Sequence, residues 1–156
     1  MPFDPSAPTP ESRGLQFGIM YVALIMTVLC IGQYLVVPDL GWVFFGYGIL
    51  IGGLINAAFA YRSDDYFRAQ CFVGMSWSIA FLTIYLVFLL LLHIADFTYV
   101  SGFRSGQDGE MVRIPMGFAG YANDASLLAM LIALAFYAGF AFAMLRDRFF
   151  VGGEEE

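Results

Sequence analysis

Four long apolar blocks constrain this chain more than any other feature of its sequence. They run over residues 16–37, 41–61, 71–95 and 125–145. Each block is close to the roughly 20 residues that a helix needs to cross the hydrocarbon core of a bilayer. Backbone amides inside lipid must be paired within the protein, and the blocks lack the alternating polarity of barrel strands. The sequence therefore predicts an all-α integral membrane protein with four transmembrane helices.

The amino-acid composition supports this class and excludes others. Hydrophobic residues make up 60% of the chain and charged residues 13%, whereas soluble domains have about 45–50% and about 25%. The net charge is −6, and all seven basic residues are arginine. Nucleic acid is excluded as a partner, because its binding needs basic patches. A retinal Schiff base is excluded as well, because it needs a lysine.

The segments between the blocks predict how the helices are arranged. Residues 38–41, PDLG, join the first two blocks, and so short a link favours an antiparallel hairpin. Arginines in short loops set the orientation in the membrane. One side of the predicted bundle holds five of them and the other side two, namely Arg13, Arg62, Arg68, Arg146 and Arg148 against Arg104 and Arg113. We therefore expect an antiparallel bundle in the bacterial inner (cytoplasmic) membrane, with both termini in the cytoplasm.

The chain is expected to divide into three parts. Residues 1–13 are rich in proline and predict a disordered cytoplasmic tail, residues 14–148 form the transmembrane domain, and residues 149–156 form an acidic cytoplasmic tail. The first block is expected to stay as a span, because no basic residue precedes Arg13 and no small-residue cleavage site follows the block. Residues 96–124 predict one sizeable outer loop, either a short hairpin around SGQDG or an irregular loop.

Polar residues just before two of the blocks predict where helices begin. Ser63 is expected to cap the third helix and to be followed by an acidic first turn, where negative charge suits the positive helix end. Asp64 and Arg68 have the spacing of a favourable i, i+4 ion pair. Asn123 or Asp124 is expected to cap the fourth helix.

Small residues on the second and fourth helices are the predicted packing positions, because helices in lipid associate through close backbone approach. The second helix has two small-residue steps, and the fourth has ridges on roughly opposite sides. These positions are Gly48 with Gly52, Gly53 with Ala57, Ala125 with Ala129 and Ala133, and Ala135 with Gly139 and Ala143. Two ridges allow one contact within the bundle and one with another subunit; the alternative is that membrane helices are simply rich in glycine and alanine.

Three polar residues lie inside the apolar blocks at a similar predicted depth. They are Asn56 on the second helix and Ser76 and Ser78 on the third. We expect Asn56 to bond to one of these serines or to a helix backbone, as polar residues between membrane helices commonly do. The alternative is an ion or substrate path, which the absence of acidic and basic residues deep in the blocks disfavours.

The single histidine, His93, ends the longest apolar run, and Asp96 follows one helical turn later. Gln33 and Tyr34 lie near the same predicted membrane face on the first helix. These four residues are the candidate polar cluster and the one place where titratable groups are expected to converge. The functional interpretation is a proton-sensitive site; the structural one is a polar stop where lipid gives way to the outer loop.

The sequence offers no recognisable catalytic or cofactor motif. One histidine excludes a haem held by two, and Cys30 and Cys71 form no CxxC pair, so they are interpreted as small apolar residues. Neither a zinc ligand set nor a GxGxxG, P-loop or HExxH pattern occurs. We therefore predict no catalytic residue, no metal and no cofactor. A quinone-binding site is an alternative that the sequence does not exclude, since such a site needs only an apolar cavity with a few polar groups.

Three functional hypotheses follow from these features. The leading one is a non-catalytic multi-pass subunit or assembly factor of a bacterial inner-membrane complex, whose partners are the lipid bilayer and other membrane subunits, or itself through the fourth helix. The second is a small homo-oligomeric transporter or channel, which rests on Asn56 and the glycine-rich second helix. The third is a quinone- or haem-associated redox subunit centred on His93.

Overall fold

The computed structural model describes residues 10–36, 43–60, 63–104 and 124–151. Within these ranges the chain forms four α-helices, α1 (Pro10–Val36), α2 (Val43–Ala58), α3 (Asp65–Arg104) and α5 (Ala125–Arg146), and α5 continues into the π-helical turn η2 (Asp147–Val151). The predicted all-helical fold is confirmed for this part of the chain. Residues 1–9, 105–123 and 152–156, which include most of the predicted tails and outer loop, lie outside the described residues.

Three helical segments are long and apolar enough to cross a membrane, namely Ser12–Val36, Asp65–Ile94 and Ala125–Phe149. They support a membrane protein, as the sequence predicts. The apolar segment of α2, Phe45–Ala58, is shorter. At the usual rise of an α-helix, α2 extends about 24 Å, against a hydrocarbon core of about 30 Å. The fourth predicted span is therefore shown as an apolar helix rather than as a helix of membrane length.

Helix α3 differs most from the prediction, which placed its span at 71–95 and an outer loop at 96–124. The helix begins at Asp65, as expected from the cap region, but it continues to Arg104. The predicted loop is therefore wrong for residues 96–104. The reason is that the apolar block ends before the helix does, since residues 96–101 contain no proline or glycine that would interrupt the backbone. The start of α1 at Pro10 is similar, because proline suits the first helical position and brings residues 10–13 into the helix rather than the predicted tail.

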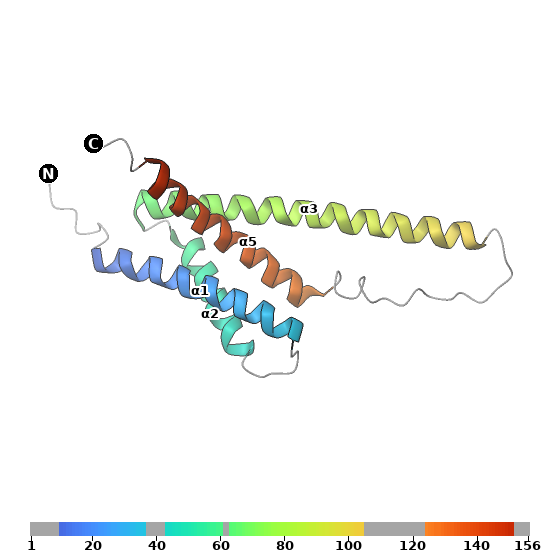
Figure 1. Ribbon diagram of the computed structural model, residues 1–156, viewed down its shortest axis with the longest axis horizontal. Helices are drawn as coiled ribbons and strands as arrows, with labels where there is room; N and C mark the ends of the chain where they lie inside the picture. Colours follow the sequence, from blue (N-terminus) through green and yellow to red (C-terminus); the bar gives the residue numbers. More distant parts are fainter. Residues whose placement is uncertain (1–9, 37–42, 61–62, 105–123, 152–156) are drawn as a thin grey trace.

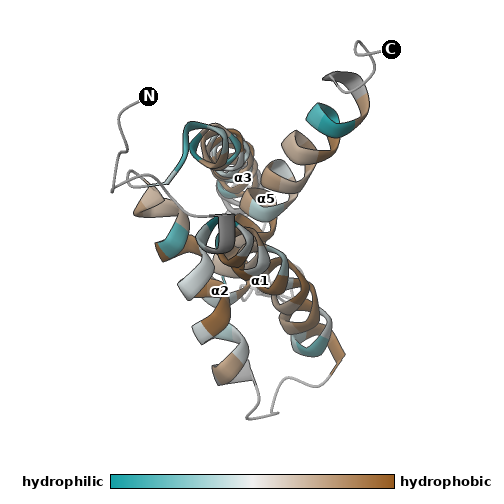
Figure 2. Cartoon of the chain, turned by 90° about the vertical axis from the view of Figure 1, so that its left-hand side faces the viewer, coloured by the Kyte–Doolittle hydropathy of each residue, from teal (hydrophilic) through white to brown (hydrophobic). Residues whose placement is uncertain are grey.

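Helix α5 lies at the centre of the arrangement (Figure 1). It packs against α3 on one side and α1 on the other, and α2 packs against α1. The first part of α3 lies along α5, whereas its C-terminal part extends beyond the ends of α1 and α5. Hydrophilic colour gathers at the start of α3 and the end of α5, and most of the remaining helix surface is pale or hydrophobic (Figure 2). This distribution is the one expected of helices whose middle parts face lipid.

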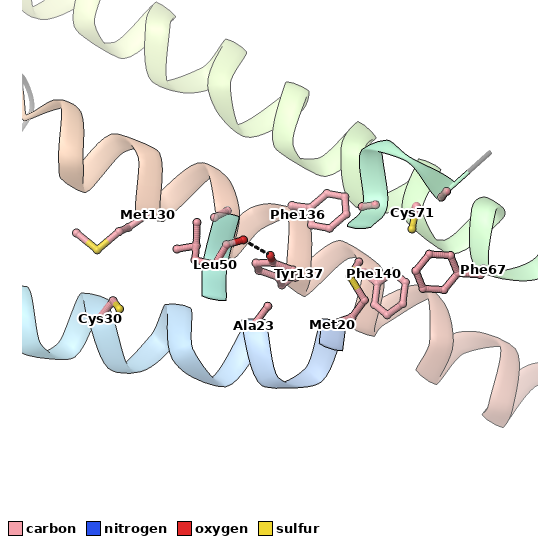
Figure 3. Close-up of a cluster of buried hydrophobic side chains, with 13 residues drawn as sticks. Met20, Ala23, Cys30, Leu50, Phe67, Cys71, Met130, Phe136, Tyr137 and Phe140 are labelled. Carbon is pink, nitrogen blue, oxygen red and sulfur yellow. Dashed lines mark hydrogen bonds between the residues drawn. The ribbon is translucent and has the colours of Figure 1, made fainter. Parts of the chain in front are cut away.

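The core is a single cluster of buried side chains from all four helices (Figure 3). Its largest fully buried member is Tyr137 on α5. The Tyr137 hydroxyl donates a hydrogen bond of 2.7 Å to the backbone carbonyl of Leu50 on α2. A buried hydroxyl needs such a partner, because an unpaired one costs about 1–3 kcal/mol. This bond therefore fixes the position of α5 relative to α2.

Glycines permit the closest approaches between these helices. A Cβ atom built on Gly53 would overlap with the Tyr137 hydroxyl, and one on Gly139 would lie 2.7 Å from Cγ of Trp77. Five of the predicted packing positions are buried, namely Gly53, Ala57, Ala133, Gly139 and Ala143, and Ala135 is half-buried. Gly48 and Gly52 are exposed, and open space surrounds the position of a Cβ on either one. Only the second small-residue step of α2 therefore serves packing among the described residues.

Two predicted helix caps have different outcomes. Asp124 caps α5 as expected, because its side chain accepts hydrogen bonds from the backbone N–H groups of Ser126 and Leu127. The prediction that Ser63 caps α3 is wrong. The cap is Asp64, whose carboxylate accepts from the Phe67 N–H at 2.9 Å. The backbone carbonyl of Asp64 accepts the first hydrogen bond of the helix, from the Arg68 N–H. Asp64 therefore occupies the N-cap position, from which a side chain reaches the free N–H groups of the first turn.

The predicted ion pair between Asp64 and Arg68 is also wrong. Asp64 pairs with Arg13 of α1 at 3.0 Å, and Arg68 pairs with Asp65 of its own helix. The cap position turns the Asp64 carboxylate towards the free N–H groups of the first turn and towards α1. Arg68 therefore meets the exposed carboxylate three residues before it.

Among the described residues, the structure shows no bond from the Asn56 amide group to either serine of the third helix or to a helix backbone, the two predicted alternatives. The hydroxyl of Ser76 donates to the carbonyl of Phe72 at 3.0 Å, and that of Ser78 donates to the carbonyl of Ile132 on α5 at 3.1 Å. Asn56 Nδ2 is buried without a hydrogen-bond partner. Serine easily reaches nearby carbonyl groups, and α2 packs mainly on α1 rather than on α3.

Replacing Gly53 with alanine should destabilise the bundle. The new Cβ would overlap with the Tyr137 hydroxyl and lie 2.7 Å from Cβ of Ala23. We expect a loss of about 1–3 kcal/mol in the free energy of unfolding, measured as a lower midpoint of thermal unfolding in detergent. The matched control is Gly52→Ala, because a Cβ there meets no atom within 4 Å. Equal midpoints for the two variants would contradict the packing.

Candidate functional site

The four residues of the predicted polar cluster have different surroundings. Tyr34 of α1 donates a hydrogen bond of 2.6 Å to Asp124, the cap of α5, and Gln33 beside it is half-buried. His93 is exposed on α3. Asp96 lies in the last part of the same helix, and its side chain is outside the described residues. The structure therefore brings Tyr34 close to Asp124. His93 and Asp96 lie in the C-terminal part of α3, which extends past the end of α1 (Figure 1).

The contact between Tyr34 and Asp124 joins α1 to the beginning of α5. The hydrogen bond from Tyr34 lowers the pKa of the Asp124 carboxyl below its ordinary value, and the N–H groups of Leu127 and Ser126 add to this effect. Each of these donors favours the ionised carboxylate. Asp124 therefore has two roles, as a helix cap and as the acceptor that holds α1 against α5. The sequence indicated both residues but not their contact.

A second and larger polar group lies where the start of α1, the start of α3 and the end of α5 come together (Figure 1). We call it the polar end. It consists of Arg13, Gln16, Ser63, Asp64, Gln70 and Asp147. The predicted cluster did not include this group. The signal in the sequence was the presence of Gln16 and Gln70 at the borders of two apolar blocks.

Three contacts between separate segments hold the polar end together. The Arg13 guanidinium lies 3.0 Å from the Asp64 carboxylate, and the Gln16 amide donates to the Ser63 hydroxyl at 2.8 Å. On the other side, the Gln70 amide donates to Asp147 at 2.6 Å. Gln70 is only 2% exposed, so this bond to a charged acceptor is shielded from water and is worth about 1.5–3 kcal/mol. Helix α3 is thus tied to α1 and to the end of α5.

An aromatic cluster lies directly beside the polar end. The ring of Phe17 on α1 meets Phe67 on α3 edge to face, with ring centroids 5.2 Å apart, and lies 6.0 Å from Phe140 on α5. Phe67 and Phe140 are buried. Edge-to-face pairs of this kind stabilise by about 0.5–1.5 kcal/mol beyond their buried area. The polar contacts and these rings together make a three-helix junction.

The chemistry available at the polar end is that of a structural junction. The Asp147 carboxylate accepts from Gln70 on one oxygen and from Arg146 on the other. The side-chain carbonyl oxygens of Gln16 and Gln70 are buried without a donor. Among the described residues, no group of three or more His, Cys, Asp or Glu side chains is placed to hold a metal ion. The charged side chains of Arg13, Asp64 and Asp147 take part in contacts between helices at this end.

Acid should weaken the contact between Tyr34 and Asp124. The folded-state pKa of Asp124 lies below its ordinary value of 3.8. This carboxylate therefore contributes stability that is present above that ordinary value and is lost as the pH falls through the folded-state pKa. Replacing Tyr34 with phenylalanine removes the largest cause of the lowered pKa, so the variant should lose less stability in acid than the wild type.

The measurement is the midpoint of thermal unfolding in detergent between neutral pH and about pH 2. Tyr21→Phe is the control, because that hydroxyl of α1 faces the sulfur of Met144 rather than a carboxylate. It should keep the acid profile of the wild type. If Tyr34→Phe also keeps that profile, Asp124 does not depend on Tyr34.

Known proteins offer no identification of this site or of the chain. No protein-family model matches the chain, and no curated protein or solved structure is significantly similar to it. Function is therefore inferred from the arrangement of helices and polar groups alone.

Proposed function

We propose that this chain is a non-catalytic multi-pass subunit or assembly factor of a bacterial inner-membrane complex, and that another membrane protein packs along α3. The observation that carries the proposal is the exposure of α3. Each membrane-length helix contains an apolar stretch of 18 residues. Of the residues in this stretch, 22% are buried within the chain for α1 and 39% for α5, but 0% for α3. Among the described residues, the apolar part of this membrane-length helix is thus the least buried of the three.

The exposed part of α3 is large and continuous. Exposed apolar residues surround the helix over its C-terminal half, namely Ile84, Leu86, Val87, Phe88, Leu90, Leu91 and Ile94. Described contacts between α3 and α5 lie in the N-terminal half of α3, where Gly74 lies against Phe136 and the Ser78 hydroxyl donates to the Ile132 carbonyl. Lipid chains solvate such a helix, but association in a membrane is favoured by packing that a second helix supplies.

The orientation that we propose has the polar end in the cytoplasm. The polar end and the side chains next to it hold Arg13, Arg68, Arg146 and Arg148, whereas Arg104 ends α3 on the other side. Short loops rich in arginine stay on the cytoplasmic side of the membrane. The start of α1 and the end of α5 then face the cytoplasm, and the far end of α3 faces the other side.

A second candidate function is a small homo-oligomeric transporter or channel that assembles through α2. Gly48 and Gly52 form a GxxxG step whose surface is open, and such steps allow two helices to approach closely. Asn56 follows at the same helical spacing and is half-buried. These observations favour contact between copies of α2.

Photocrosslinking in native membranes separates the two candidates. A photoreactive residue in place of Leu91 on α3 should yield one discrete adduct with a different membrane protein, because this position is 59% exposed and lies beyond the N-terminal end of α5. Ile25 on α1 is an equally exposed control at 59%, and it should react with lipid only. Adducts are identified by their mass and by sequencing.

The same experiment includes Ile55 on α2, which is 51% exposed. An adduct of twice the chain mass at Ile55 would favour the homo-oligomer. If Leu91 gives only lipid adducts and the chain purifies alone in mild detergent, the proposal of a subunit bound through α3 is wrong.

A further inference from the structure

A hollow lies at the polar end between the first turn of α3 and the end of α5. Its volume is about 530 Å³, and it is lined by Tyr66, Met144, Asp147 and Arg148. Tyr66 belongs to the start of α3 and the other three residues to the last turn of α5 and to η2. The hollow is therefore placed where the membrane-length segments end, at the level of the lipid headgroups in the proposed orientation.

Arg148 is the residue that distinguishes this hollow. Arg13, Arg68 and Arg146 each pair with an aspartate, whereas Arg148 makes no ion pair with another described side chain. A guanidinium presents N–H groups in a planar fork that fits two oxygens of a phosphate. An unpaired arginine beside a hollow at the headgroup level is thus suited to a phosphate ligand.

The other lining residues fit the same ligand. The Tyr66 hydroxyl supplies a further donor for a phosphate oxygen, and Met144 offers apolar surface to a glycerol backbone or the top of an acyl chain. Asp147 is the one acidic member, but it accepts from Arg146 on one oxygen and from Gln70 on the other. Its charge is therefore compensated within the protein and repels a phosphate less than a free carboxylate would.

We propose that this hollow binds the phosphate group of a membrane phospholipid, with Arg148 as the main ligand and Tyr66 as the second donor. Phosphate chemistry is shared by lipid headgroups and by soluble phosphate. The apolar side chain of Met144 and the position at the end of the apolar segments favour the lipid. The proposal requires that the chain spans a membrane, but it is independent of any partner on α3.

The test is lipid retention by the purified full-length chain, measured by native mass spectrometry after exchange into detergent with phosphatidylglycerol. Arg148→Gln should lower the retained lipid about tenfold, as expected from the loss of a charge-assisted contact. The matched control is Arg68→Gln, which removes the same charge from an exposed side chain that pairs with Asp65 and does not line the hollow. It should retain lipid within about twofold of the wild type.

Tyr66→Phe provides an independent variant, because it removes one donor and leaves every charge in place. It should lower retention by a few fold, about the value of one hydrogen bond. Adding inorganic phosphate identifies the source of the ligand. Retention that withstands a large excess of phosphate supports a lipid, whereas displacement by phosphate alone would show a site for the soluble ion and overturn the lipid assignment.

Equal losses in Arg148→Gln and Arg68→Gln would also overturn the proposal, since they would indicate a general effect of positive charge. No loss in Arg148→Gln would do the same. Each variant is compared with the wild type by its helix content and its elution volume, so that loss of lipid is separated from loss of fold. Arg148 is exposed, and its replacement leaves the core unchanged.

Discussion

The packing of α5 against α1 and α2 around Tyr137 is the contact on which the rest of this structure depends. In lipid, the hydrophobic effect does not drive helices to associate, so close packing and a few buried hydrogen bonds must hold them together. Tyr137 supplies both, because its ring is buried in the core and its hydroxyl bonds to the Leu50 carbonyl. Gly53 and Ala23 leave the space that this ring and hydroxyl need. A side chain at position 53 would remove the contact that places α2.

The two ends of α5 are fixed by the same kind of interaction, but to different helices. At its start, the cap Asp124 accepts a hydrogen bond from Tyr34 on α1. At its end, Asp147 accepts one from Gln70 on α3. Each aspartate satisfies its own helix end and a neighbouring helix together. Helix α5 is therefore held at both ends and in the middle, which explains why it takes part in most of the described contacts between helices.

The sequence predicted the helices well, because the length and apolar character of a membrane helix are local properties. It also indicated Asp124 as a cap, which depends on residues within one turn. It did not predict the contacts of Gln70 or Arg13, since these depend on which helix ends become neighbours. For a similar reason, the sequence did not distinguish between the two small-residue steps of α2, which were both predicted as packing positions. Gly52 and Gly53 are adjacent in sequence, and only the position of α1 and α5 decides which of them is buried.

The length of α3 determines how far His93 lies from the polar end, and this distance bears on the role of the histidine. Asp64 joins α3 to the start of α1 through Arg13, which places the beginning of α3 at the headgroup level in the proposed orientation. His93 then lies about 44 Å along the helix from Asp64. Membrane helices tilt by about 20° on average, and at that tilt the separation is about 41 Å along the membrane normal, against a hydrocarbon thickness of about 30 Å. In the proposed orientation, His93 is therefore expected near the far boundary of the apolar core, at the end of the segment Asp65–Ile94. This geometry favours a polar residue at the water boundary over a buried proton site.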